Sequence, residues 1–153
     1  MAQLQDAPVM AALSRQWIES GLVWRYTPAR MAALIRDPDS IALVACAGPH
    51  INGFAVMRFA EVQAHLVLLC VLPAQQRQGL GRALCDWLLA SARVAGIESV
   101  QLELRADNPG AWMFYRRLGF TEQHTVPAYY DGQIAARRMR LLLRVIDSPR
   151  EAH

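Results

Sequence analysis

Two glycines one residue apart, with arginines on either side, form the most informative local pattern in this sequence. Gly79 and Gly81 stand where a helix is expected to begin, within the stretch from Gln76 to Arg82. Glycine lets the backbone approach a ligand closely, and the free N–H groups of a helix start bind anions. Arg77 and Arg82 can add charge-assisted hydrogen bonds to phosphate. The pattern predicts a pyrophosphate site, although the same glycines would also suit a tight turn without a ligand.

Two familiar nucleotide-binding patterns do not fit this turn. All 16 basic residues are arginine. A phosphate loop of the GxxxxGK(S or T) type needs lysine and is therefore excluded, as is Schiff-base chemistry on a lysine. The dinucleotide-binding pattern needs a third glycine three residues after Gly81, where Leu84 stands. With both patterns excluded, coenzyme A is the pyrophosphate ligand that the turn favours.

A strand, a turn and a helix are expected to hold this site. Residues 64–72 are almost wholly apolar, which indicates a central strand covered on both faces, and Pro73 ends it. The helix after the turn has Gly96 as its expected C-cap. The predicted buried stripe of this helix consists of Leu80, Ala83, Leu84, Trp87, Leu88 and Ala95.

The following strand, residues 97–106, alternates between two faces. The apolar face is predicted to carry Val100, Leu102, Leu104 and Ala106, and the polar face Gln101, Glu103 and Arg105. Asn108 and the proline after it open a short helix that Gly119 ends. Residues 120–126 and 135–145 are predicted to form two final strands.

Two helices are expected before any strand. Asp6 can cap the first helix, which Gly21 stops, and Thr27 begins the second. Residues 41–47 and 54–60 are predicted to form a β-hairpin. The apolar face of the first helix is predicted to consist of Val9, Leu13 and Trp17. This order of elements indicates a single α/β domain, spanning residues 1–153, on a mixed sheet.

Composition narrows the class of protein. A hydrophobic share of 54% and a charged share of 19% are typical of compact globular proteins. A net charge of +3 is too small to indicate a nucleic-acid partner. Three cysteines without a CxxC pair predict neither a disulfide framework nor a metal site. The longest apolar run, Leu66 to Leu72, is too short to cross a membrane, so we expect a cytoplasmic protein without a membrane partner.

Two ordered blocks resemble the GNAT superfamily of N-acetyltransferases. QRQGLGRAL, from Gln76 to Leu84, is similar to the acyl-CoA-binding signature (Q or R)-x-x-G-x-(G or A) of that family. LELRADN, from Leu102 to Asn108, with the LGF of residues 118–120, is similar to a block of the branch that acetylates ribosomal-protein alanine, as is the Tyr129-Tyr130 pair. The resemblance covers approximately residues 41–142.

The resemblance implies a fold and an activity. The fold is a mixed, mostly antiparallel sheet with splayed central strands flanked by helices. The activity is direct transfer of an acetyl group from acetyl-CoA, as cosubstrate, to a primary amine of a small molecule or a peptide N-terminus. No metal is implied. An alternative is a catalytically weak acyl-CoA-binding regulatory module of the same fold.

The resemblance also assigns cofactor contacts to particular residues. Backbone groups of residues 69–71 match those that pair with the pantetheine arm, and residues 77–82 match the pyrophosphate cradle. Asn108 matches a residue that contacts the cofactor, but an Asn-Pro helix start would look the same without a ligand. The predicted cofactor-binding residues are Leu69, Cys70, Val71, Arg77, Gln78, Gly79, Leu80, Gly81, Arg82 and Asn108.

Three residues are candidates for the chemistry. Tyr115 matches the acid that donates to the CoA sulfur, although it would also suit the packed face of a helix. Glu103 matches the general base, and an ion pair with a neighbouring arginine is the alternative role. His65 is a rival base, because a histone-acetylating branch has a carboxylate at the corresponding place; a structural hydrogen bond is its alternative role. Solvent could also take the proton.

The sequence departs from the family in two places. Ile134 and Ala135 stand where the alanine-acetylating branch has an acidic pair, and arginines follow them. These arginines would suit an acidic or polar acceptor, but Arg138, Arg140 and Arg144 share one parity and could form a solvated strand face. At most Met1 to Gln5 is available for the family's first strand, so that edge is either missing or supplied by another subunit, which makes a homodimer a possibility.

Overall fold

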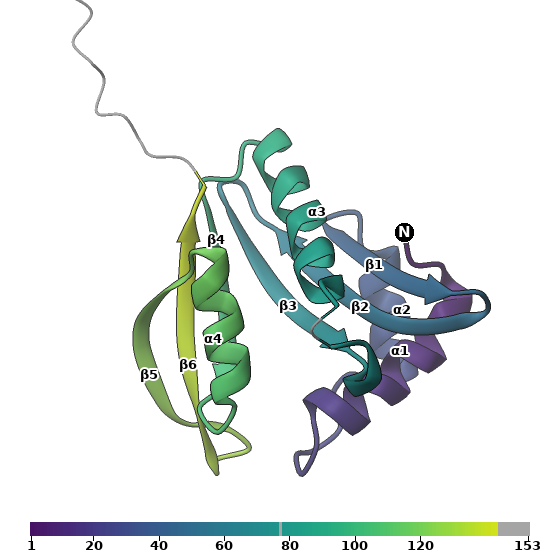
Figure 1. Cartoon of the computed structure of the whole chain (residues 1–153), viewed down its shortest axis with the longest axis horizontal. Helices are drawn as coiled ribbons and strands as arrows, with labels where there is room; N and C mark the ends of the chain where they lie inside the picture. Colours follow the sequence, from purple (N-terminus) through teal and green to yellow (C-terminus); the bar gives the residue numbers. More distant parts are fainter. Residues whose placement is uncertain (77, 144–153) are drawn as a thin grey trace, which may run out of the picture.

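The computed structural model describes residues 1–76 and 78–143, and the strands within these residues form one six-stranded sheet (Figure 1). The order across the sheet is β1-β2-β3-β4-β6-β5. Neighbouring strands are antiparallel except for β3 and β4, which are parallel. The strands are β1 (Ser40–Ala47), β2 (His50–Phe59), β3 (Gln63–Val71), β4 (Ser99–Arg105), β5 (Thr121–Tyr130) and β6 (Ile134–Leu142). The predicted mixed, mostly antiparallel sheet is confirmed.

Helices cover the two faces of this sheet unequally. Helices α1 (Ala7–Leu13) and α2 (Pro28–Arg36) pack on one face of β1 to β3, whereas α3 (Leu80–Val94) and α4 (Pro109–Leu118) pack on the opposite face (Figure 1). Three short helical turns flank these helices: η1 (Leu4–Asp6) precedes α1, η2 (Ser14–Ile18) follows α1, and η3 (Pro73–Gln75) lies between β3 and α3. On the α1 and α2 side, no described helix therefore packs over β4, β5 and β6.

The predicted start signals of the first two helices have different outcomes. Thr27 is the N-cap of α2, as predicted, because its hydroxyl accepts a hydrogen bond from Arg30 N at 3.4 Å. Asp6 makes no side-chain cap for α1, so this prediction is wrong. Its carboxylate accepts instead from Gln3 N at 2.8 Å within the preceding single turn.

Two predicted apolar stripes are also wrong in part. Val9 and Trp17 are each 46% exposed, and α1 buries small or flexible side chains instead: Ala7, Met10 and Ala11. In α3, Trp87 is 48% exposed and Ala83 and Ala95 are exposed; the buried side chains are Leu84, Cys85, Leu88, Leu89 and Ala92. The physical reason is the same in both helices. Apolar residues occupy more than one face, and packing selects the face whose shape fits the sheet.

A bulge divides β3 into two parts. Val56 of β2 pairs with Leu68 and Met57 pairs with Leu66, so Val67 is left without a partner. The extra residue reverses the alternation of the strand. Leu66 therefore packs in the core below α3, whereas Leu68 and Cys70 pack in the core below α1 and α2.

The parallel pairing between β3 and β4 is short. It consists of Gln63–His65 against Ser99–Gln101. Beyond these residues, on the far side of the bulge, the two strands diverge (Figure 1). The predicted splay of the central strands is confirmed, and it creates the space in which the site lies.

The amino-terminal residues do not form a strand beside β1 in the described structure. Ala2 N donates one hydrogen bond to Ala42 O at 2.8 Å, and β1 is the edge of the sheet. A second subunit at this edge stays a prediction. The three cysteines are free: Cys46 is exposed, and Cys70 and Cys85 are buried. Among the described helices, none has the length and apolar character needed to cross a membrane.

Candidate active site

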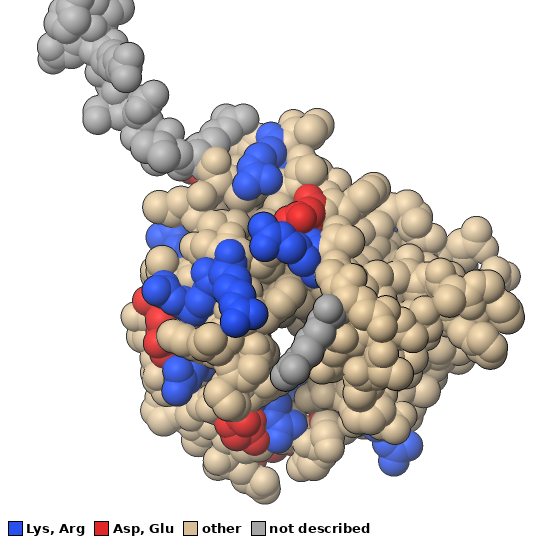
Figure 2. Space-filling model, viewed as in Figure 1, with Lys and Arg blue, Asp and Glu red and all other residues tan. Residues whose placement is uncertain are grey.

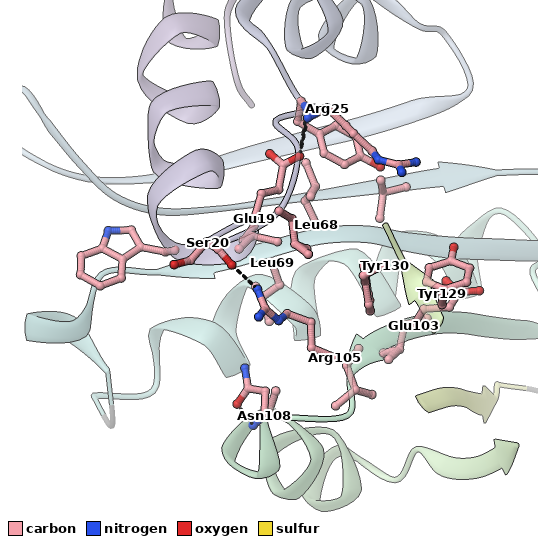
Figure 3. Close-up of a pocket in the computed structure, with 18 of the residues that line it drawn as sticks. Glu19, Ser20, Arg25, Leu68, Leu69, Glu103, Arg105, Asn108, Tyr129 and Tyr130 are labelled. Atoms are coloured by element: carbon pink, nitrogen blue, oxygen red, sulfur yellow. Dashed lines mark hydrogen bonds between the residues drawn. The ribbon is translucent and has the colours of Figure 1, made fainter. Parts of the chain in front are cut away.

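A cleft of about 650 Å³ opens between the diverging ends of β3 and β4 (Figure 3). Its walls come from these two strands, from α4, from the segment between Trp17 and Arg30, and from residues 129–131 at the β5–β6 turn. The cleft brings together five of the predicted site residues: His65, Leu69, Glu103, Asn108 and Tyr115. Five parts of the chain thus meet around one space.

The two candidate bases are hydrogen-bonded to each other. His65 Nε2 lies 2.5 Å from Glu103 Oε2, and Arg138 Nε donates to Glu103 Oε1 at 3.1 Å. His65, Glu103 and Arg138 thus form a hydrogen-bonded row across three strands. The sheet register explains this row, because His65 pairs with Gln101 and Glu103 pairs with Arg138. The Glu103 side chain is 11% exposed and that of His65 is 45% exposed. The carboxylate is therefore largely buried between its two partners, whereas the imidazole reaches solvent.

The surroundings of Glu103 keep it ionised. The hydrogen bond from His65 lowers the pKa of Glu103 below its ordinary value, burial opposes this effect, and the Arg138 guanidinium lowers the pKa further. Because an ionised carboxylate only accepts hydrogen bonds, His65 donates through Nε2. The other ring nitrogen, Nδ1, is then the basic one.

Tyr115 enters the cleft from the buried face of α4. The residue is 8% exposed, and its ring makes edge-to-face contacts with Phe114 and Phe120, at centroid distances of 5.1 and 5.6 Å. Burial raises the pKa of Tyr115 well above its ordinary value. The phenol is therefore protonated at neutral pH and can act as a hydrogen-bond donor. Both roles considered for this residue, packing and donation, are compatible with this position.

The backbone of β3 presents hydrogen-bonding groups to the gap. Leu72 N donates to Asn52 O, the residue preceding Gly53 on β2. Because N–H groups alternate in direction along a strand, those of Leu69 and Val71 point away from β2, towards the gap. Cys70 lies differently, since its backbone is directed to β2 and its buried side chain does not line the cleft. Burial raises the pKa of the Cys70 thiol to about 11.

The turn before α3 has the conformation that its glycines favour. Gly79 is the N-cap of α3 with a φ of 81°, in the left-handed region. A Cβ on Gly81 would lie 3.4 Å from side-chain atoms of Phe114 and Val71, so the start of α3 packs against the end of β3. Gln78 is exposed and Leu80 half-buried. Arg77 lies outside the described residues.

Basic side chains gather on the outer face of α3 and α4 (Figure 2). Arg82, close to the turn, is exposed and forms an ion pair with Asp86 at 3.7 Å. Three more exposed arginines follow on these helices: Arg93, Arg116 and Arg117. These three lie in the last turns of α3 and α4, where positive charge is favourable next to the negative end of the helix dipole.

Asn108 caps α4. Its Oδ1 accepts a hydrogen bond from Ala111 N at 3.1 Å, and the residue also lines the cleft. The capping role anticipated from the Asn-Pro pair is therefore present. A cofactor contact by Asn108 stays a prediction.

The arginines of β6 do not form a solvated face. Arg138 binds Glu103, and Arg140 is half-buried. Arg137 lies on the other side of the sheet, near Glu122 and over the Trp112 ring. Arg144 lies outside the described residues. Since Glu103 neutralises Arg138, this strand gives a weak basis for predicting an acidic acceptor.

Sequence reasoning missed one wall of the cleft. Residues 19–26, between η2 and α2, line it, and Glu19 is 6% exposed there. The Glu19 carboxylate accepts hydrogen bonds from Ser14 Oγ and from the N–H groups of Arg25 and Tyr26. The one signal in the sequence that could have indicated this wall is Glu19, an acidic residue near the end of the first helix. Its type alone does not predict the contacts, because the partners lie on both sides of a turn.

Comparison with known proteins agrees with this geometry. Residues 9–120, most of the chain, match the acetyltransferase (GNAT) family. The chain belongs to this family. The family assignment made from the two sequence blocks is thus confirmed.

Relatives of this GNAT protein include enzymes named as N-acetyltransferases. A segment of 77 residues is 39% identical to ribosomal protein bS18-alanine N-acetyltransferase from Escherichia coli K12, covering 50% of this chain and 52% of the relative. An N-alpha-acetyltransferase from Sulfurisphaera tokodaii is 37% identical over 75 residues, covering 48% of this chain and 45% of the relative. The matched segment thus spans about half the length of these relatives.

Solved structures extend the similarity over nearly the whole GNAT chain. Ard1 from Thermoplasma volcanium superposes with a TM-score of 0.81 at 27% identity, covering 92% of this chain and 93% of that one. The Escherichia coli ribosomal-protein-S18-alanine N-acetyltransferase gives a TM-score of 0.81 at 25% identity, covering 97% and 94%. The resemblance to the alanine-acetylating branch is confirmed at the level of sequence and fold.

Proposed function

We propose that this protein transfers the acetyl group of acetyl-CoA to a primary amine, on a small molecule or at a peptide N-terminus. The observation that carries the proposal is the His65–Glu103 pair at the vertex of the splayed strands. The pair and Tyr115 line the same cleft, whose volume of about 650 Å³ is sufficient for a thioester and an amine. The names of the relatives support an amine as the acceptor.

The chain offers a fitting cradle for acetyl-CoA, which supplies the acetyl group as a thioester. The Gly79–Gly81 turn and Arg82 would hold the pyrophosphate at the start of α3. The N–H groups of Leu69 and Val71 would pair with the pantetheine arm in the gap beside β3. One of them would donate to the thioester oxygen, where negative charge develops during the reaction.

We assign proton acceptance to His65 and positioning to Glu103. Both carboxylate oxygens of Glu103 already accept hydrogen bonds, from His65 and from Arg138. His65 is more exposed and keeps Nδ1 for a proton taken from the ammonium group, directly or through water. This division makes Glu103 the residue that fixes the orientation and tautomer of the imidazole.

Tyr115 is proposed to assist the departing sulfur. Its phenol is protonated at neutral pH and can donate a hydrogen bond to the thiolate as the carbon–sulfur bond breaks. The aromatic contacts with Phe114 and Phe120 fix the direction of the ring, so that the donor needs no rearrangement.

A thiol-release assay tests the proposal. The purified protein would be mixed with acetyl-CoA and a panel of small amines and short peptides with free or blocked α-amino groups. Free CoA thiol is followed by absorbance and the acetylated product by mass spectrometry. Thiol release that depends on one class of amine supports the proposal. Tight CoA binding without thiol release across the panel contradicts it and favours a regulatory acyl-CoA-binding module.

A further inference from the structure

The segment of residues 19–26, called the strap below, contacts both sides of the cleft. It leaves η2 on the side of β1 to β3, where α1 and α2 pack. Its far contacts are on β4 and on the β5–β6 turn, which belong to the other half of the sheet. The short pairing of β3 with β4 also joins these two halves. The strap is therefore a second connection between the two walls of the cleft.

Asp131, in the β5–β6 turn, and Arg105, on β4, form hydrogen bonds with the strap across the cleft. Asp131 accepts hydrogen bonds from Val23 N at 2.7 Å and from Arg25 Nη2 at 2.8 Å. Arg105 Nη1 donates to Ser20 O at 2.6 Å (Figure 3). Main-chain groups of the strap take part in two of these three bonds. The contacts thus fix its backbone and not only its side chains.

Hydrogen bonds within the strap also fix its conformation. The buried Glu19 carboxylate binds the N–H groups of Arg25 and Tyr26, which closes the segment into a compact turn. A preformed turn loses little conformational entropy when its outer residues meet Asp131 and Arg105. The strap is accordingly built to lie across the cleft in one conformation.

The strap lies on the side from which an acceptor would approach. The turn that is proposed to hold pyrophosphate begins α3, on one face of the sheet. The strap continues from α1 and η2, on the opposite face, which is also the face carrying His65 and Glu103. An amine that enters the cleft from this face lies beside the strap, since residues 19, 20, 22, 23, 25 and 26 line the cleft together with His65.

We propose that Asp131 and Arg105 are positioning residues that hold the strap across the acceptor side of the cleft. This inference rests on the proposed acetyl transfer. A fixed strap limits the entry of bulk water to the thioester and gives the acceptor a defined path. Within the strap, Arg25 contacts Asp131 and Ser20 contacts Arg105. These residues are proposed to act by holding the strap and not by contact with the reacting atoms.

Four variants test the proposal. Asp131→Gly removes the carboxylate at a position whose φ of 52° suits glycine. Arg105→Met removes the guanidinium and keeps the apolar stem, and Arg25→Ala removes one of the two bonds to Asp131. Glu122→Gln is the matched control, because it neutralises an acid on the same hairpin that pairs with Arg137 and not with the strap.

Three measurements are made on each variant: amide hydrogen exchange of residues 19–26, CoA affinity by calorimetry, and thiol release from acetyl-CoA with water as the only acceptor. For Asp131→Gly we expect about tenfold faster exchange at Val23 and about tenfold faster hydrolysis, with CoA affinity within about twofold of wild type. Arg25→Ala is expected to give a smaller effect, since Val23 N keeps its partner. Glu122→Gln is expected to match wild type.

The exchange measurement separates this proposal from the proposed function. Unchanged exchange at Val23 in Asp131→Gly overturns the strap, whatever the activity. Faster exchange with unchanged hydrolysis shows that the strap does not limit the access of water to the thioester, and this result also overturns the proposal. If wild-type protein releases no thiol with any amine, acetyl transfer fails, while faster exchange together with faster hydrolysis in Asp131→Gly still supports the strap.

Discussion

The imidazole of His65 and the carboxylate of Glu103 form a hydrogen bond of 2.5 Å across 38 residues of sequence. They stand at the point where β3 and β4 stop pairing. A base placed at this point reaches the gap on one side and solvent on the other. The pair therefore unites two residues that the sequence offered as rivals.

Replacing either member of the pair is expected to have nearly the same effect as replacing both. His65→Gln and Glu103→Gln should each lower kcat/KM by about 100-fold, because the imidazole and its positioning carboxylate act as one unit. The double variant should lose little more. Steady-state thiol release over a range of pH measures this, and additive losses would show that the two residues act independently.

The decrease in the free energy of unfolding at acidic pH should depend in part on Glu103. Its pKa is lowered in the folded protein from an ordinary value of about 4.5. A carboxylate with a lowered pKa stabilises the fold above its unfolded value, and this contribution is lost as pH falls through the folded value. Urea unfolding at several pH values should therefore give Glu103→Gln a flatter dependence below about pH 4.5. A slope equal to that of wild type would contradict the pairing.

Tyr115→Phe should separate catalysis from packing. The variant keeps the ring contacts with Phe114 and Phe120 and loses the phenolic hydroxyl alone. We expect kcat to fall by about tenfold or more, with CoA affinity and the unfolding midpoint nearly unchanged. Tyr115→Leu serves as the contrast, because it also removes aromatic packing and should lower stability by about 1–3 kcal/mol. Equal kcat for Tyr115→Phe and wild type would remove the donor role.

Gly79→Ala should weaken CoA binding through the backbone. The φ of 81° is unfavourable for alanine, while the space around its Cβ is open, so the cost is conformational, at about 1 kcal/mol. Calorimetry should show roughly fivefold weaker CoA binding. Gly110→Ala in α4 is the matched control, because no positive φ is found there. If both variants bind CoA equally well, the turn does not form the pyrophosphate cradle.

Ala128→Gly is expected to stabilise the protein. Ala128 has a φ of 53° at an irregularity in β5, where a side chain is strained. Relief of this strain should exceed the added chain entropy of glycine by about 0.5 kcal/mol in urea unfolding. Ala90→Gly, at an exposed position within α3, should do the opposite and cost about 1 kcal/mol. A destabilised Ala128→Gly would show that the irregularity carries no strain.

Local signals in the sequence were sufficient for several features. Thr27 before proline, the glycine turn at Gly79 and the end of α4 at Gly119 all occur as predicted. Each depends on the φ and ψ preferences or hydrogen bonds of a few neighbouring residues, which are encoded at the same place in the chain. The alternation of β4 was predictable for the same reason.

Contacts between distant segments were decided by the tertiary structure. The bulge at Val67, the direction of Trp17 and Trp87, and the ties of the strap to Asp131 depend on which surfaces pack together. An apolar residue on a helix can face the core or solvent with the same local energy, so its direction follows from the fit of the whole core. The same holds for sheet register.

Residue types and their spacing were enough to predict the family, the element order and the residues suited to acid–base chemistry. Packing of the sheet made His65 and Glu103 partners, paired Arg138 with Glu103, and turned the Cys70 side chain away from the cleft. Residue type and local preference are properties of short stretches of chain. A distance of a few ångströms between residues far apart in sequence exists once packing has fixed the register of the strands that carry them.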